Sequence, residues 1–316
     1  MTRKSSAGLG GALTARQRRL VEASVRIADE APNRSDFLHT VMCQVGLPRS
    51  QTDELRFERR NGHISILLEA GKLFNGRHWV QQPLPYGSTP RLVMVHVSSE
   101  AIRTQSRSIE IGDSMRSFLT TLGMTTSGGA RGGYTTLRRQ MEALAACRLT
   151  IGMFAEGQVV TRKADPIEQF TAWLDQDGTQ PTLWPGSLEL TQDFYNTLLD
   201  HAVPLDYRAL AALKHSALAL DVYTWLAHRL CRVKEVGGVK LSWQNLLAQF
   251  GQEYADTRNF KHEFKNVLRQ VLLVYPEARV EEVEGGLKLF PSRPPLSQTQ
   301  VSLALPPGVT VDKPEG

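Results

Sequence analysis

Residues 259–274 read NFKHEFKNVLRQVLLV, and this stretch carries the clearest helical pattern in the chain. Its apolar side chains recur at the spacing of one helix face: Phe260, Phe264, Val267, Leu268, Val271 and Leu272. This spacing predicts an amphipathic helix with that face in a core, capped by Asn259 and ended by Pro276. The opposite face gathers cationic and polar side chains: Arg258, Lys261, His262, Lys265, Asn266 and Arg269.

The segments on either side of this helix are predicted from their own patterns. A helix over 216–232 precedes a short strand at 239–241, and Ser242 caps a second helix that Gly251 closes. After the long helix, 278–283 and 287–290 alternate around a Glu-Gly-Gly turn and predict a β-hairpin. The order is therefore helix, strand, helix, long helix, hairpin.

The first half of the chain repeats that order. It contains a predicted helix at 91–104, a strand at 108–112, a helix at 114–122 before Gly123, a helix at 134–147, and a hairpin formed by 149–154 and 158–161. A helix-turn-helix with a β-hairpin beside its third helix is a winged helix. The sequence thus predicts an α+β, mainly α fold with two tandem winged-helix domains and an N-terminal helical extension.

The resulting domain organisation has five parts. They are a partly helical extension at 1–80 with a disordered start, winged-helix domains at 81–164 and 208–293, an acidic connector at 165–207 between them, and a Pro-rich disordered tail at 294–316. Within the extension, Thr14 is expected to cap a helix that ends before Pro32. Residues 36–45 are expected to form a second helix, and Asn61-Gly62 a hairpin turn.

Charge is distributed unevenly along the chain. The net charge is +5 and the pI about 9.2, yet residues 165–207 contain eight acidic residues and no lysine or arginine. Two basic blocks therefore flank a segment that is not expected to lie against phosphate, unless the pattern is a chance fluctuation on a solvated face. A basic protein of this kind favours a polyanionic partner.

Composition also limits the class of protein. Hydrophobic residues make up 41% of the chain, as in a soluble globular protein. No run approaches the ~18 apolar residues of a membrane span, and the first residues lack the apolar core of a secretory signal. Cys43, Cys147 and Cys231 lie far apart without metal spacing, which indicates reduced, buried thiols in a cytoplasmic protein.

The third helix of each repeat is the candidate for reading double-stranded DNA. In the first repeat the candidates are Arg131, Tyr134, Thr135, Thr136, Arg138 and Arg139, with Arg162 and Lys163 just past the hairpin. Arg138 and Arg139 would reach base edges, while Arg131 and the threonines would hold phosphate at a helix N-terminus. In the second repeat the candidates are the cationic and polar side chains of 258–269. The alternative is that both faces are ordinary solvated surfaces and that the Gly-rich stretch 128–133 is a plain turn.

No arrangement of residues indicates catalysis. The eight histidines are dispersed, no His-x-His pair exists, and no Cys or His spacing fits a zinc site. The glycines match neither a phosphate-binding loop nor a dinucleotide fingerprint. The sequence therefore predicts a binding protein, not an enzyme, without metal or cofactor.

Three segments together resemble a known family. The chain is similar to RepA-type replication initiators of broad-host-range bacterial plasmids, those of the W incompatibility group among them. The similarity is carried by residues 85–91 (PYGSTPR), 108–112 (SIEIG) and 132–141 (GGYTTLRRQM). The resemblance extends over about 30–293. It implies a cytoplasmic protein that binds direct repeats (iterons) in a plasmid origin, helps to melt adjacent DNA and recruits the host replication initiator and helicase. It also implies a possible homodimer, although this chain has no evident leucine zipper near its start.

Two other functions fit the same pattern. A winged-helix transcriptional regulator would bind inverted repeats as a dimer, whereas an initiator would bind direct repeats as monomers. An adaptor that uses winged helices to bind protein would form complexes with little dependence on salt.

Overall fold

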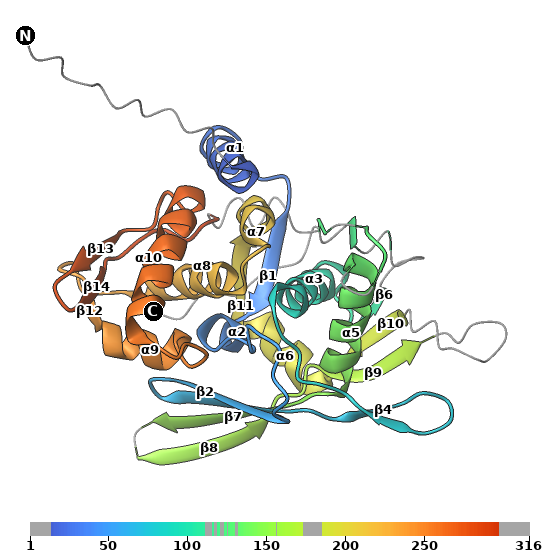
Figure 1. Cartoon of the computed structure of the whole chain (residues 1–316). Coiled ribbons are helices and arrows are strands. Elements are labelled where there is room, and N and C mark those ends of the chain that lie inside the picture. The colour runs from blue at the N-terminus through green and yellow to red at the C-terminus, as the bar shows by residue number, and fades with distance from the viewer. Residues whose placement is uncertain are drawn as a thin grey trace, which may run out of the picture.

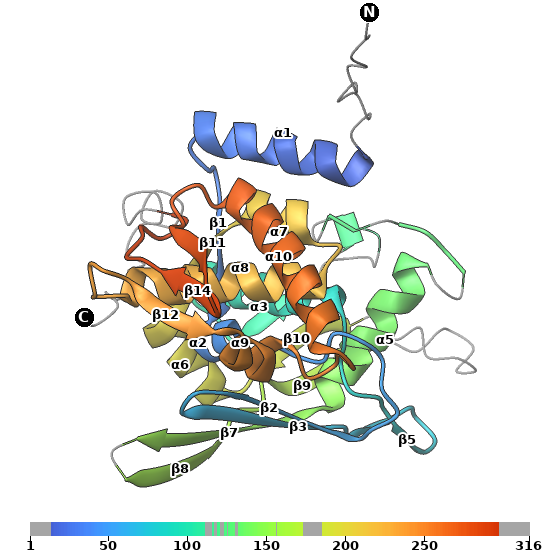
Figure 2. The same ribbon diagram turned by 60° about the vertical axis from the view of Figure 1, so that its left-hand side comes forward.

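The structure is a computed structural model that describes residues 14–110, 116, 119–120, 123–124, 126–129, 132–155, 157–172 and 185–296. The expected disordered start, most of the predicted helix 114–122 and the tail after residue 296 lie outside the described residues. In the described part, helices gather above a four-stranded sheet (Figures 1 and 2). The fold is of the α+β type, as predicted.

The C-terminal half of the described chain, here called the second unit, has the element order that the sequence predicts. It consists of β11 (Ala202–Asp206), α7 (Tyr207–Leu213), α8 (Ala217–Arg229), the 3-10 helix η1 (Leu230–Arg232), β12 (Val239–Ser242), α9 (Trp243–Phe250), α10 (Thr257–Val274), β13 (Val280–Val283) and β14 (Gly286–Leu289). Its three-stranded sheet has the order β12-β14-β13. Ser242 caps α9 as expected, but Asp256, not Asn259, caps α10, because the Asp256 carboxylate accepts the Arg258 N–H.

The described elements of the first unit follow the same order, apart from the predicted helix 114–122, most of which lies outside the described residues. The unit consists of β1 (Ser35–His39), α2 (Thr40–Gln44), α3 (Ser88–Thr104), β6 (Ser108–Glu110), α5 (Gly133–Ala146), β9 (Ile167–Ala172) and β10 (Pro185–Leu190). Its sheet has the order β6-β10-β9. In both sheets the last strand of the unit therefore lies between the other two. α6 (Gln192–His201) then leads into the second unit.

The hairpin predicted at 149–154 and 158–161 exists, but it joins a different sheet. It forms β7 (Arg148–Ala155) and β8 (Gln158–Lys163), and β7 pairs with β3 (Ile64–Glu69), the neighbour of β2 (Arg56–Asn61). The resulting sheet, β2-β3-β7-β8, is built from two insertions into the first unit. The strand that pairs with β6 is β10, so the hairpin beside α5 is β9–β10, not β7–β8.

The acidic segment 165–207 is part of the folded core, not only a link between units. It supplies β9 and β10, and Leu188 and Leu190 of β10 are fully buried. It also supplies β11, which pairs with β1 in antiparallel fashion and so joins the two units. Net charge does not reveal this role, because the alternating leucines of β10 decide which side of the strand is buried.

The prediction of a helix over 36–45 is wrong in its first half. Residues 35–39 form β1, and all five are buried. A strand that is buried on both faces shows no apolar–polar alternation, so the pattern of its sequence does not predict a strand. Only the short α2 that follows is helical, and the pairing of β1 with β11 overrides local preference.

α1 (Ala15–Asp29) lies across the second unit, against α7 and α10 (Figure 2). Thr14 caps it as predicted, with Gln17 completing a capping box. At its other end, Arg208 of α7 donates hydrogen bonds to the carbonyls of Arg26 (2.8 Å) and Glu30 (2.7 Å). A cation beside the last carbonyls of a helix is the favoured arrangement at its C-terminus. The buried apolar side chains form one core that spans both units.

His39 is a buried histidine that the fold holds in its neutral form. Its Nδ1 accepts the Val41 N–H (3.2 Å) and caps α2, while its Nε2 lies 3.1 Å from the Thr197 hydroxyl. Since Nδ1 accepts, Nε2 carries the proton and donates to Thr197. Burial, reinforced by His201, lowers the pKa of His39 to about 4 from 6.5. Protonation of Nδ1 would remove the cap.

We expect the protein to lose stability as the pH falls from 6.5 towards 4. In that range the unfolded chain protonates His39 and the folded chain does not, so acid favours unfolding, by roughly 3 kcal/mol for this group. Urea unfolding of wild type and His39→Asn at pH 7.0, 5.5 and 4.5 measures the effect. Asn caps a helix without titrating, so the variant should show a shallower pH dependence. An equal change in the exposed-site control His78→Asn would contradict this role.

Candidate nucleic-acid interface

α10 presents its apolar stripe to the core and its cationic side to the surface, as predicted. Phe260, Phe264, Val267 and Val271 are fully buried. On the other side, Arg258, His262 and Arg269 are exposed, and Lys261, Lys265 and Asn266 are half-buried. The structure therefore leaves this face of α10 open to a ligand.

Three polar side chains on α10 form a hydrogen-bonded row. The Asn266 amide lies 3.1 Å from His262 Nε2, and its Oδ1 accepts a hydrogen bond of 2.9 Å from Arg269 Nη1. The row fixes the orientation of the amide between an imidazole and a guanidinium. A helix with such side chains fits the major groove, where Asn reads adenine and Arg reads guanine.

The two lysines of α10 lie over a tryptophan. Lys261 Nζ and Lys265 Nζ are 5.9 and 5.4 Å from the ring centroid of Trp243, the first residue of α9. Lys265 also forms an ion pair with Glu282 of β13. Its charge is therefore partly neutralised by the hairpin next to it, which the sequence pattern did not indicate.

We expect Glu282→Gln to strengthen binding of duplex DNA a few-fold. Removal of the carboxylate frees Lys265, so one more phosphate contact becomes available, and the slope of log K against log salt should steepen by about one. Fluorescence anisotropy at several salt concentrations measures both quantities. Glu281→Gln is the matched control, since it removes the same charge from the adjacent position of β13. Equal effects of both variants would contradict a specific role for the Lys265–Glu282 pair.

α5 carries two exposed arginines near its middle. Arg138 and Arg139 are exposed, and neither forms an ion pair with another described residue. Glu142, on the next turn, has a pKa that burial raises and that the two arginines lower. Leu137, Met141 and Leu144 are buried on the opposite face. α5 thus has the same division as α10, with an apolar side in the core and a cationic side outside.

The start of α5 is closed by its own glycine-rich loop. The Ser127 hydroxyl and carbonyl accept the Gly133 and Tyr134 N–H groups, at 3.2 and 3.3 Å, and the Thr135 hydroxyl donates to the Gly129 carbonyl (2.9 Å). A Cβ on Gly132 would lie 2.3 Å from the Gly128 carbonyl oxygen, so the turn needs glycine there. These contacts occupy donors that we expected to hold phosphate.

The remaining candidates are not all placed beside α5. Tyr134, Thr135 and Thr136 are half-buried at its start. Arg131 lies outside the described residues. Arg162 and Lys163 are exposed, but they stand on β8, the edge strand of the four-stranded sheet, instead of on the hairpin that pairs with β6.

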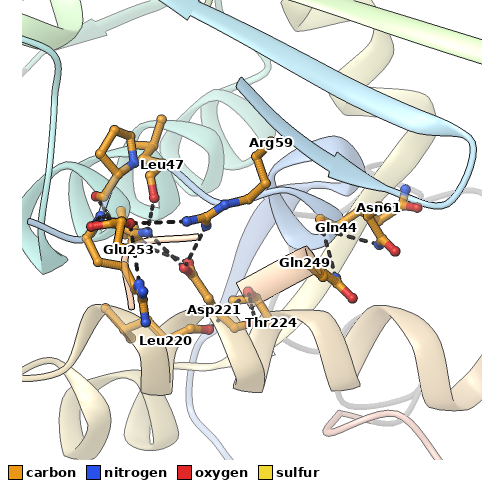
Figure 3. A network of polar contacts seen from close by, with 12 residues as sticks. Gln44, Leu47, Arg59, Asn61, Leu220, Asp221, Thr224, Gln249 and Glu253 are labelled. Atoms are coloured by element: carbon orange, nitrogen blue, oxygen red, sulfur yellow. Dashed lines mark hydrogen bonds and ion pairs between the residues drawn. The ribbon is translucent and has the colours of Figure 1, made fainter. Parts of the chain in front are cut away.

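A buried ionic network joins the two units, and the sequence analysis does not predict it (Figure 3). Arg91 of α3 donates to both carboxylate oxygens of Asp221 of α8, at 2.6 and 2.8 Å. The fully buried Arg59 of β2 lies 3.6 Å from Asp221 and 3.2 Å from Glu253, in the turn before α10. Burial lowers the pKa of Arg59 to about 10, so it stays charged at neutral pH.

This network positions the helices that carry the two cationic faces. α3 packs against α5, and α8 packs against α10. The Arg91–Asp221 pair therefore fixes α3 of the first unit against α8 of the second, and α5 and α10 lie on either side of them (Figure 1). The available signal was one charged residue beside buried apolar residues in each helix, Arg91 in α3 and Asp221 in α8. Pairing residues 130 positions apart needs the fold.

Metal sites, membrane spans and reactive thiols can be assessed among the described residues. They contain no group of three or more His, Cys, Asp or Glu side chains arranged to hold a metal ion. No helix among them has the length and apolar character to cross a membrane. Cys43 and Cys147 are buried as expected, and burial raises the pKa of each thiol, whereas Cys231 is exposed, contrary to expectation.

Comparison with known proteins gives one family match. The family model RepA_C, plasmid encoded RepA protein, matches residues 84–245, about half of the chain. The match begins just before α3 and ends within α9. No curated protein matches the sequence.

Proposed function

The chain belongs to the RepA_C family of plasmid-encoded RepA proteins, and we propose that it initiates plasmid replication by binding repeats in the plasmid origin as duplex DNA. The family makes it a plasmid replication protein. The mode of DNA binding, the melting of adjacent DNA and the recruitment of host initiator and helicase belong to the proposal.

We further propose that both units are winged helices. In the second unit α8, β12, α9, α10 and the β13–β14 hairpin follow one another, the described elements α3, β6, α5 and β9–β10 of the first unit correspond to four of them, and each sheet places the last strand in the middle. In this assignment the wing of the first unit is β9–β10, which contacts α5, and that of the second unit is β13–β14. The four-stranded sheet is an addition to the first unit.

One observation carries the proposal. In both units the helix before the hairpin, α5 or α10, has a buried apolar face and an exposed cationic face, which is the form of a recognition helix in a major groove. We assign base contacts to Arg138 and Arg139 in α5 and to His262, Asn266 and Arg269 in α10. Arg258, Lys261 and Lys265 would contact phosphates, with Arg131, Tyr134 and Thr136 doing so at the start of α5, where the Thr135 hydroxyl already donates to the Gly129 carbonyl.

The charges of the second wing suggest where the duplex lies. Glu281, Glu282 and Glu284 are exposed on β13 and its turn, so this wing is unlike a phosphate-binding wing. The α10 helix, rather than its wing, would then provide the contacts of the second unit. Arg162 and Lys163 on β8 remain candidates for contact with DNA outside the repeat.

A transcriptional regulator that binds inverted repeats as a dimer is the second candidate. The observation in its favour is β8, an edge strand whose six residues are all exposed, including Val159 at 74%. An open edge of this kind is suited to pairing with a second chain. A homodimer through β8 would bring two sets of reading helices into two-fold symmetry.

The arrangement of the DNA repeats separates the two candidates. The test measures affinity and stoichiometry on duplexes that carry the same two origin repeats head-to-tail or inverted. The initiator function predicts tight binding of one monomer per repeat on the head-to-tail duplex. A preference for the inverted duplex, occupied by a preformed dimer, would favour the regulator.

A further inference from the structure

A cavity of about 630 Å³ lies outside both proposed reading helices. It is enclosed by the β2–β3 turn on one side and by the end of α8, η1, β12 and α9 on the other. None of the residues that line it comes from α5 or α10. Its size is within the roughly 300–1,000 Å³ of small-molecule sites in proteins.

The lining of this cavity is basic and contains no carboxylate. Arg60, Arg229 and Arg232 contribute guanidinium groups, and His63 and His228 contribute imidazoles. None of the three arginines forms an ion pair with any residue that the structure describes. Arg60 and Arg232 each donate to a backbone carbonyl, of Gly62 (3.2 Å) and His228 (2.7 Å), which leaves most of their N–H donors available.

The pKa of His228 responds to the positive charges that line the cavity. Burial, together with the charges of Arg232 and Arg229, lowers its pKa to about 3. Its ring is therefore neutral at pH 7. An anion bound beside it would offset the two arginines and raise this pKa.

The rest of the wall is apolar or carries amides. Trp225, Leu241 and Leu246 supply the apolar surface. Asn61 and Gln249 donate hydrogen bonds to the Gln44 carbonyl, at 3.3 and 3.0 Å, which fixes both amides and holds the β2–β3 turn against α9 (Figure 3). Their side-chain oxygens remain as acceptors, and Asn245 adds a third amide.

We propose that this cavity binds a nucleoside phosphate. Guanidinium groups match phosphate oxygens in charge and geometry, and three of them without carboxylate partners suit a chain of phosphates. The apolar wall and the amides suit a base and sugar. The ligand would bridge the four-stranded sheet and the second unit, a role separate from the contacts of α5 and α10 with duplex DNA.

The test is isothermal titration of the full-length protein with ATP, tripolyphosphate, adenosine and a ten-residue oligothymidylate. The proposal predicts that ATP binds at least tenfold more tightly than tripolyphosphate or adenosine. It predicts a loss of at least tenfold for Arg60→Gln/Arg229→Gln. Lys72→Gln/Arg77→Gln removes two exposed positive charges elsewhere and should leave the affinity unchanged.

Further readouts exclude a structural explanation. Ala248→Trp fills the cavity without a change of charge and should also abolish ATP binding. In wild type, ATP should raise the pKa of His228 measured by NMR. Unchanged ATP affinity in Arg60→Gln/Arg229→Gln, or equal affinity for tripolyphosphate and ATP, would overturn the proposal. Tighter binding of the oligonucleotide than of ATP would overturn it as well and would indicate a path for single-stranded DNA.

These results are independent of the proposed origin binding. Arg60→Gln/Arg229→Gln should bind duplex repeats as wild type does, and variants of α5 should keep their affinity for ATP. Failure of the ATP experiment would therefore leave the assignment of the reading helices intact.

Discussion

Reversal of charge at Arg138 and Arg139 of α5 should weaken binding of the origin duplex by at least about 100-fold. A bidentate arginine contact with a base contributes roughly 1–3 kcal/mol, and a glutamate in its place also repels the nearby phosphates. Both arginines are exposed and unpaired among the described residues, so the substitution breaks no ion pair there. Fluorescence anisotropy at fixed salt, with Arg138→Glu/Arg139→Glu, gives the effect directly.

The matched control is Lys72→Glu/Arg77→Glu, which changes the net charge by the same amount on or next to the β4 (Lys72–Phe74) and β5 (Trp79–Gln81) hairpin. It should weaken binding only a few-fold, through the long-range field. Lys261→Glu/Lys265→Glu in α10 should weaken binding strongly but less than the α5 variant, because Lys265 is already paired with Glu282. If the α5 variant and the control behave alike, α5 does not read DNA.

Asp221→Ala should lower the free energy of unfolding by about 3–5 kcal/mol, the usual cost of removing one partner from a buried ion pair. Asp221 is only 6% exposed and faces two arginines, Arg91 and Arg59, whose side chains are also buried. Without the carboxylate, two positive charges remain in the interior, and Glu253 neutralises only one of them. Urea unfolding followed by circular dichroism measures the loss.

A second variant tests the same site without removing charge. A Cβ on Gly46 would lie 2.5 Å from an oxygen of Asp221, so Gly46→Ala should displace the carboxylate and also destabilise the fold. Asp200→Asn, on the exposed side of α6, is the control and should change the free energy of unfolding by less than about 0.5 kcal/mol. A stability of Asp221→Ala within about 1 kcal/mol of wild type would show that the network is not structural.

The network also has a consequence for function. It fixes α3 against α8, and these helices carry α5 and α10. A rigid link between the units keeps the two cationic helices at one separation, which reduces the entropy that the protein loses when both bind one duplex. Variants of Asp221 that still fold should therefore bind DNA less tightly, although Asp221 does not contact it.

Local patterns in the sequence predicted the elements whose structure is decided locally. The spacing of Phe260, Phe264 and Val267 gave α10 and its buried face, Asn61-Gly62 gave the β2–β3 turn, and Thr14 and Ser242 gave helix starts. In each of these, the residues that determine the structure lie within about one helical turn or one hairpin of each other.

Long-range pairing could not be predicted in this way. The β7–β8 turn is local, but β3, the other partner of β7, comes much earlier in the chain: Ile66 of β3 pairs with Ile151 of β7, 85 positions later. β1 is buried on both faces, so its sequence resembles a segment of a helix. β10 lies in the acidic segment 165–207, which the sequence pattern predicts to be a connector because of its charge. The candidate reading residues were identified by type and spacing. The ion pair of Lys265 and the closed loop at the start of α5 depend on neighbours that only the fold supplies.

Hydroxyl-radical footprinting of the full-length protein on a duplex with one origin repeat tests the central claim most directly. If α5 and α10 of one molecule enter the same duplex, the protected sugars should form two patches on one face, about one helical turn or ~10 base pairs apart. Arg138→Glu/Arg139→Glu should remove one patch and Lys261→Glu/Lys265→Glu the other. A single patch that neither variant alters, or patches on opposite faces of the duplex, would contradict the account.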